Sequence, residues 1–125
     1  MSVPLAHHIS DQQLRHELTA SRHALMTDPA LAPVRRVLDD TCGSYLSVIR
    51  LDQIPDHDED IEILLVDSNR IVRVEFALGD WHLIEVGMGS VDEYRALLGK
   101  AGRRRLAMAL KLAAECTTPY PRRLD

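Results

Sequence analysis

The fold is decided by residues 61–88, which read IEILLVDSNRIVRVEFALGDWHLIEVGM. This stretch holds most of the β-branched residues of the chain, together with its only Trp and its only Phe. Apolar and polar residues alternate in it with a period of two, which is typical of strands that bury one face. Turn-forming residues interrupt the alternation at 67–70 and at 79–80. The stretch therefore predicts three consecutive antiparallel strands, with helices before and after them.

The turn between the first two strands determines which side chains share a face. Asn tolerates a positive φ, so we predict a two-residue turn at Ser68-Asn69. Pairing Asp67 with Arg70 across this turn gives an entirely apolar face. The predicted pairs are Leu65–Val72, Ile63–Val74 and Ile61–Phe76.

The second hairpin needs a longer loop. A two-residue turn at Gly79-Asp80 would place Glu85 on the buried face, whereas a three-residue loop that includes Trp81 keeps this face apolar. We therefore expect a glycine bulge and a three-residue loop. The predicted pairs are Phe76–Ile84, Val74–Val86 and Val72–Met88. A fourth strand is expected over Tyr45–Leu51, joined through the loop 52–60.

The opposite face of this predicted sheet is half apolar. Its charged members suit water: Glu62, Arg73, Glu75 and Glu85. Its apolar members do not: Leu64, Val66, Ile71 and Leu83. Such a face is expected to be covered, either by the terminal helices or by a homodimer or protein partner.

Helix signals flank the strands on both sides. Ser10 and Gln13 form a capping box at the start of a first helix. A second helix is predicted over about 33–41, with Gly43 as its stop. After the sheet, a capping box at Ser90 begins a last helical region that runs to about Thr117.

Glycine interrupts that last helical region. A continuous helix would place Arg105 within the apolar stripe, so we expect a break at Gly99. A second helix then begins with GKAGRRR, and cations in this first turn oppose the helix dipole. The resulting candidates for anion binding are Lys100, Arg103, Arg104 and Arg105. The alternative is a solvated basic turn.

Together these elements predict an α+β fold with the order α-α-β-β-β-β-α-α and a four-stranded antiparallel meander sheet. The first two helices are expected to pack on the face that carries Val72, Val74 and Phe76. We predict a single domain over residues 1–117 and an extended or disordered tail over 118–125.

The apolar runs and the cysteines of the sequence indicate the cellular compartment that we expect. The chain has no apolar run near the ~20 residues that span a membrane, and its start does not resemble a secretory signal. Cys42 and Cys116 are far apart in the sequence, which favours reduced thiols in a cytoplasmic protein. We therefore expect no membrane partner.

Charge is distributed unevenly around a net value of -4. Residues 39–94 carry three positive and fourteen negative groups, whereas residues 95–125 carry eight positive and two negative groups. The loop 52–60, DQIPDHDED, alternates Asp56, Asp58 and Asp60 as in the first half of a calcium loop. Ile61 stands where that loop needs glycine, so we expect a solvated acidic loop that engages a basic partner.

No catalytic, metal or nucleotide motif is complete, and no cofactor is predicted. The leading hypothesis is a small cytoplasmic, non-enzymatic protein-binding module of chaperone, immunity or adaptor type, which binds a protein partner or a second copy of itself. The expected contact residues are Leu64, Ile71, Arg73, Trp81, Leu83, Asp56, Asp58 and Asp60.

Two alternatives remain open. One is a nucleic-acid-associated regulator that binds phosphates through the basic C-terminal helix. The other is a small enzyme whose site is assembled from non-local residues. Glu75 and Glu85, which pair across two strands in the predicted register, are one such combination.

Overall fold

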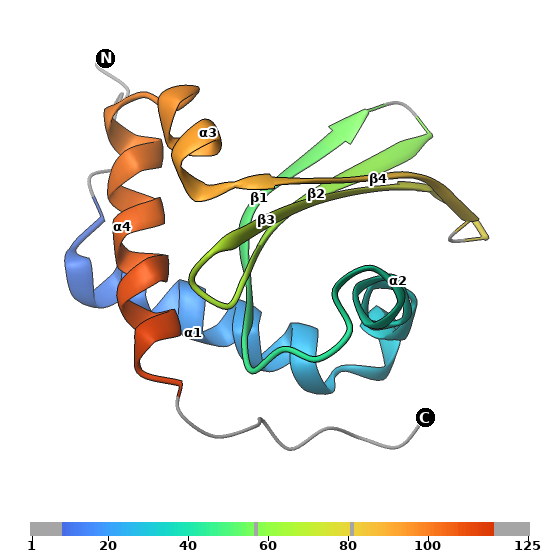
Figure 1. Cartoon of the computed structure of the whole chain (residues 1–125), viewed down its shortest axis with the longest axis horizontal. Helices are drawn as coiled ribbons and strands as arrows, with labels where there is room; N and C mark the ends of the chain where they lie inside the picture. The colour runs from blue at the N-terminus through green and yellow to red at the C-terminus, as the bar shows by residue number, and fades with distance from the viewer. Residues whose placement is uncertain (1–8, 57, 81, 117–125) are drawn as a thin grey trace, which may run out of the picture.

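The structure is a computed structural model that describes residues 9–56, 58–80 and 82–116. The helices before the sheet are α1 (Asp11–Thr27), the short 3-10 helix η1 (Pro29–Leu31) and α2 (Ala32–Cys42). The strands are β1 (Val48–Asp56), β2 (Glu59–Val66), β3 (Arg70–Ala77) and β4 (His82–Ser90). The last helices are α3 (Val91–Ala96) and α4 (Lys100–Ala114). The predicted α+β fold and its order of helices and strands are confirmed (Figure 1).

The predicted helix ends follow from local hydrogen bonds. The Ser10 hydroxyl accepts a bond from Gln13 N at 3.1 Å. Ser90 and Glu93 exchange both bonds of a capping box at the start of α3. Gly43 closes α2 with a φ of 71°, a conformation that costs glycine little.

The break in the last helical region is also confirmed. Helix α3 ends at Ala96, and Gly99 is the N-cap of α4. The tail predicted over 118–125 lies outside the described residues.

The four strands form a meander in the order β1-β2-β3-β4. Strand β1 differs from the prediction because it begins at Val48 and continues to Asp56. It pairs with β2 along its whole length, with a register shift between Arg50 and Asp52. The acidic segment 52–60 is therefore mostly a hairpin rather than a solvated loop.

The predicted register of β2 and β3 is wrong by one residue. Val66, not Asp67, pairs with Arg70, so the turn has one more residue than predicted. Asp67 adopts a φ of 55°, and its Oδ1 accepts bonds from the backbone N–H groups of Leu46 at 2.8 Å and Ser47 at 3.1 Å. These distant contacts hold the longer turn.

This shift reverses the faces of β2, since neighbouring residues of a strand point in opposite directions. Val72 lies opposite Leu64 rather than Leu65. Ile61, Ile63 and Leu65 therefore lie on the face opposite to that of Val72, and each face is largely apolar.

The hairpin of β3 and β4 is closer to the prediction. The pairs Val74–Val86 and Val72–Met88 are confirmed. Phe76 pairs with Leu83 instead of Ile84, because a bulge lies between Glu75 and Phe76 in the pairing. Gly79 has a φ of 104° in the connecting turn. Trp81, which was expected in the loop, lies outside the described residues.

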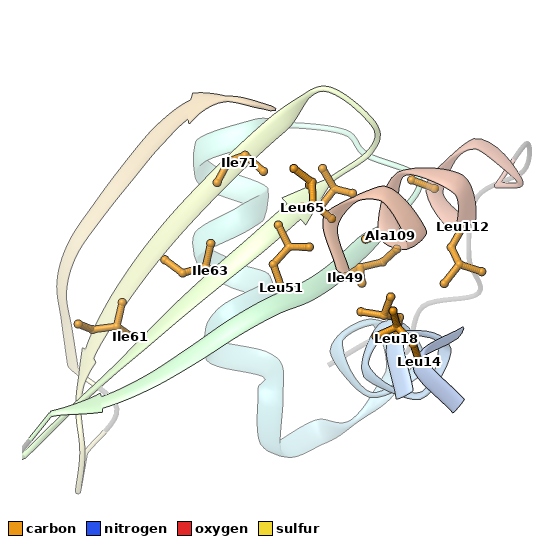
Figure 2. Close-up of a cluster of buried hydrophobic side chains, with 12 residues drawn as sticks. Leu14, Leu18, Ile49, Leu51, Ile61, Ile63, Leu65, Ile71, Ala109 and Leu112 are labelled. Carbon is orange, nitrogen blue, oxygen red and sulfur yellow. The ribbon is translucent and has the colours of Figure 1, made fainter. Parts of the chain in front are cut away.

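Helices cover both faces of the sheet, and we name each face after the helix on it. On the α4 face, strand residues pack against α1 and α4; the buried strand residues are Ile49, Leu51, Ile61, Ile63, Leu65 and Ile71. Figure 2 shows Leu65 and Ile49 close to Ala109 of α4, whereas Ile61 lies farther along the sheet. The α2 face carries Val48, Leu64, Val66, Val72, Val74 and Phe76, which pack with Val34, Val37 and Leu38.

The structure corrects the prediction of which side chains each face of the sheet buries. Leu64, Val66 and Ile71 were expected on a half-apolar outer face, but all three are buried beneath helices. Helix α2 packs on the predicted face. Helix α1 contributes to both cores, with Leu14 and Leu18 in one and Leu25 and Met26 in the other.

Candidate functional site

Among the residues that the structure describes, the largest run of exposed apolar side chains lies on β4, the last strand of the meander. Every residue of β4 is exposed. Leu83 and Val86 pair with Phe76 and Val74, which are buried on the α2 face. Ile84 and Met88 share that face, because the face of a side chain alternates on either side of Val86.

These four side chains form what we call the β4 strip. Their exposed fractions are 40% for Leu83, 43% for Ile84, 37% for Val86 and 50% for Met88. Their neighbours on β3 are nearly inaccessible, so the covering by α2 stops between β3 and β4. The strip is therefore an apolar surface that the described part of the fold leaves in contact with water.

On the α4 face, β4 carries a carboxylate and two glycines. Glu75 and Glu85 are directly opposite, as predicted from the sequence. Arg73 Nη2 lies 3.0 Å from Glu75 Oε1 and pairs in register with Gly87. Glu85 has no ion pair or hydrogen bond of its own within the described ranges.

A groove of about 440 Å³ lies next to these charges. Its lining residues include Ile63, Ile71, Arg73, Gly87, Gly89, Tyr94 and Leu97. A Cβ atom added at Gly87 or Gly89 would meet nothing within 4 Å, so the glycines leave this face of β4 open. Leu97, the residue directly after α3, is 83% exposed, which is unusual for a leucine, and it adds an apolar side chain to this groove.

The structure places the residues that were predicted as contacts in different environments. Leu83 belongs to the β4 strip, and Arg73 lies on the other face of the same hairpin. Leu64 is fully buried and Ile71 is 6% exposed, so the prediction that they form an open contact surface is wrong. The reason is that helices cover both faces of the inner strands. Trp81 lies outside the described residues.

The acidic residues also separate. Asp58 is exposed, whereas Asp60 is buried and its Oδ2 accepts a bond from Gln53 Nε2 at 2.9 Å. Asp56 belongs to β1, and its side chain is not among those described. No cluster of three metal-ligating side chains occurs in the described ranges. Asp58 lies at the surface, as predicted.

Sequence reasoning placed Glu62 in water, but it is buried at 1% exposure. Arg50 Nε donates to its Oε1 at 2.5 Å. Burial raises the pKa of Glu62 to about 7; Arg50 opposes this shift and Asp60 adds to it. A carboxyl group with such a pKa is suited to proton transfer, but one this buried is shielded from substrates.

The basic residues at the start of α4 have partners within the chain. Arg103 Nε donates to the carbonyl of Leu98 at 3.1 Å, and Arg104 Nη2 contacts Asp11 Oδ1 at 2.7 Å. Arg105 Nε donates to the carbonyl of Leu51 at 2.8 Å. These bonds explain why cations are tolerated in this first turn. Anion binding by the three arginines and Lys100 stays a prediction.

A second cavity, of about 410 Å³, lies beside Arg105 between β1 and the last two helices. Its lining includes Asp52, Gln53, Tyr94 and Leu98. Burial raises the pKa of Tyr94, and the nearby Asp52 adds to the shift. Two arginines line this cavity, and both have partners within the chain: Arg105 donates to backbone carbonyls, and Arg50 is paired with Glu62. Neither of these described cations is therefore free to attract an anion.

Comparisons with protein-family models, with curated proteins and with solved structures found no match for this chain. In the described ranges, no helix is both long enough and apolar enough to cross a bilayer. Cys42 and Cys116 are free thiols, as predicted.

Sequence reasoning assigned three members of the β4 strip to a buried face: Ile84, Val86 and Met88. Their alternation is the same whether or not a helix covers them, so it carries no information on exposure. One available signal was topological, because a meander leaves its last strand at an edge. The chain also turns directly from Ser90 into α3, with no loop to cover that edge.

Proposed function

We propose that this chain is a non-enzymatic protein-binding module whose contact surface is strand β4. The observation that carries the proposal is the exposure of the β4 strip, in which four adjacent apolar side chains face solvent beside a well-packed core. Apolar patches of this kind mark interaction sites on monomeric proteins. Binding would bury the strip, and the open edge of β4 would offer backbone hydrogen bonds to an extended segment.

Charge at one end of the sheet supports a basic partner. Both hairpins end on the same side, because Glu59 at the start of β2 pairs with Ala77 at the end of β3 (Figure 1). The exposed carboxylates of Asp58 and Asp80 therefore lie near the start of the β4 strip. Charges beside an apolar contact increase the rate of association and select among partners more than they add affinity.

The nucleic-acid alternative has less support. Three of the arginines that it requires bind carbonyl or carboxylate oxygens within the chain. An enzyme has less support as well. Glu62, whose pKa is raised most among the described residues, is buried within the protein and shielded from substrates.

Site-specific photo-crosslinking tests the proposal. A photoreactive residue is placed at Met88, the most exposed member of the strip, in the cells that produce the protein naturally. The control carries the same group at Arg36, which is exposed on α2. We expect a crosslinked protein adduct at 88 and none at 36. Equal yields at both positions, or no adduct at 88, would contradict a contact surface on β4.

A further inference from the structure

The sheet has two edge strands, and one of them is protected. On β1, the Ser21 hydroxyl accepts a bond from Arg50 N at 3.3 Å. Arg105 donates to the carbonyl of Leu51 at 2.8 Å from α4. Side chains of α1 and α4 therefore occupy backbone groups of Arg50 and Leu51, in the part of β1 where another strand would pair.

Strand β4 has no such protection. Its sequence, HLIEVGMGS, contains neither lysine nor proline, the residues that commonly keep other strands away from an edge. In the described chain, the side-chain hydrogen bonds to its backbone lie at its two ends, where Asp80 accepts from His82 N and Glu93 from Ser90 N. The middle of β4 is open to pairing.

We propose that a second copy of this chain pairs with β4, strand to strand and antiparallel, about a twofold axis at Val86. This inference rests on the proposed function and names the partner at that surface. The product is one continuous sheet in which the two β4 strands are neighbours at its centre. A symmetric dimer of this kind uses the same surface on both copies.

The apolar residues of β4 match themselves in this register. Val86 lies opposite the partner's Val86, and Ile84 lies opposite the partner's Met88. Directly opposite side chains in antiparallel strands are about 5 Å apart, so these pairs are in contact. The β4 strips of the two copies then contact each other on the α2 face, and each covers part of the other.

The charges on the α4 face select the same register. Glu85 lies opposite the partner's Gly87, whose neighbour on β3 is the partner's Arg73. Two strand spacings separate these residues, about 10 Å between Cα atoms, and glycine leaves the space between them empty. The two long side chains can therefore meet above Gly87, twice in the symmetric dimer.

The neighbouring registers lack this complementarity. An axis at Glu85 would place two identical carboxylates opposite each other, which is destabilising. An axis at Gly87 would place Glu85 opposite the partner's Gly89, beside the apolar Ile71. Within one copy, Glu85 lies opposite the like charge of Glu75, and the diagonal Arg73 is paired with Glu75. The second copy brings a further Arg73 within reach of each Glu85.

Cysteine crosslinking tests the register. In the variant Val86→Cys the two new thiols lie opposite each other, within the range that a disulfide spans. In the matched control Ile84→Cys they are about four residues apart along the strands, roughly 14 Å. Both variants keep Cys42 and Cys116. We expect a disulfide-linked dimer for Val86→Cys under mild oxidation and little for Ile84→Cys; equal yields overturn the register.

Charge exchange tests the contact itself by sedimentation at micromolar concentration. We expect the wild-type chain to be a dimer, and Glu85→Arg or Arg73→Glu to weaken dimerisation roughly tenfold each. A mixture of the two variants should regain the dimer, because each variant then meets its opposite charge. Circular dichroism confirms that both variants fold.

A wild-type monomer, or a mixture that stays monomeric while both variants are folded, overturns the inference. A crosslink from Met88 to a different protein, with no crosslink between copies, also overturns it but supports the proposed function. Loss of every crosslink at Met88 contradicts the proposed function as well.

Discussion

Arg50 on β1 and Glu62 on β2 form an ion pair inside the sheet, with Arg50 Nε 2.5 Å from Glu62 Oε1. The Glu62 side chain is 2% exposed, whereas that of Arg50 is 27% exposed and still reaches water. The carboxylate therefore bears most of the desolvation, and its pKa is raised to about 7 despite the neighbouring cation.

This raised pKa predicts a pH-dependent stability. Between the ordinary pKa of 4.5 and about 7, the folded chain binds a proton at Glu62 that the unfolded chain does not. The contribution of this group to the free energy of unfolding is therefore present below pH 4.5 and is lost as the pH rises to about 7. The loss is at most about 3 kcal/mol.

Urea unfolding at pH 5 and pH 8 measures the effect. The variant Glu62→Gln removes the titrating group, so it should lose less stability than the wild type between the two pH values. Asp40→Asn, on an exposed carboxylate of α2, is the control and should follow the wild type. If Glu62→Gln also follows the wild type, Glu62 does not titrate in this range.

The Asp67 turn predicts a ranking of variants. Asp67→Ala removes an acceptor of two backbone N–H groups and places a Cβ in the left-handed region without a polar side chain. We expect it to cost about 2–4 kcal/mol in the free energy of unfolding. Asp67→Gly also loses these hydrogen bonds, but glycine adopts the positive φ without strain. It should therefore cost less than Asp67→Ala.

Asp67→Asn keeps a side-chain oxygen and should cost least of the three. Denaturant unfolding gives the order. If the alanine and glycine variants are equally stable, the positive φ at Asp67 contributes nothing to the loss.

The burial of Leu64 predicts a large loss of stability when it is truncated. Leu64→Ala opens a cavity between β2 and α2 and should cost about 2–5 kcal/mol. Leu97→Ala, at a residue 83% exposed, should change stability by no more than about 0.5 kcal/mol. Thermal unfolding of the two variants checks this. A stable Leu64→Ala chain would mean that this leucine faces solvent.

The contact between α4 and the start of α1 predicts that alanine variants of two neighbouring arginines differ in stability. Arg104 donates to the carbonyl of Ile9 at 2.6 Å and to Asp11 at 2.7 Å. Arg104→Ala should therefore cost about 1–2 kcal/mol, because it frees the end of α1.

Arg103→Ala is the matched control, because the described side-chain bond of Arg103 is to Leu98, five residues earlier in the sequence, and not to α1. It should cost about 0.5 kcal/mol or less. Hydrogen exchange at the first turn of α1 should increase only in the Arg104 variant. If exchange increases equally in both variants, the bonds from Arg104 to the start of α1 are not what stabilises this turn.

Local signals predicted much of the fold because their causes are local. Ser10, Gly43 and Ser90 end or begin helices through bonds within a few residues. The register of β3 and β4 was largely correct because it places Val86 and Met88 on the same face as Val74 and Val72, which keeps the apolar residues of both strands together. The register of β2 and β3 was wrong because Asp67 is held by the backbone at Leu46 and Ser47, which are distant in the sequence.

The candidate site was less predictable, because the exposure of its residues depends on contacts between elements that are distant in the sequence. Leu83 and Arg73 were identified, but Leu64 and Ile71 were assigned to an open face that does not exist. Val86 and Met88 were assigned to a covered one. Alternation shows that a strand has an apolar face, but it does not show which face a helix covers or where that covering ends.

The sequence alone specifies the number, type and order of the helices and strands, because hydrophobic periodicity and helix caps act over a few residues. Only the tertiary structure decides how residues 61–88 distribute their side chains between two cores and which strand stays uncovered. One additional residue in a turn reverses every side chain of β2. The reach of α2, which ends at β3, makes β4 a surface rather than part of the core.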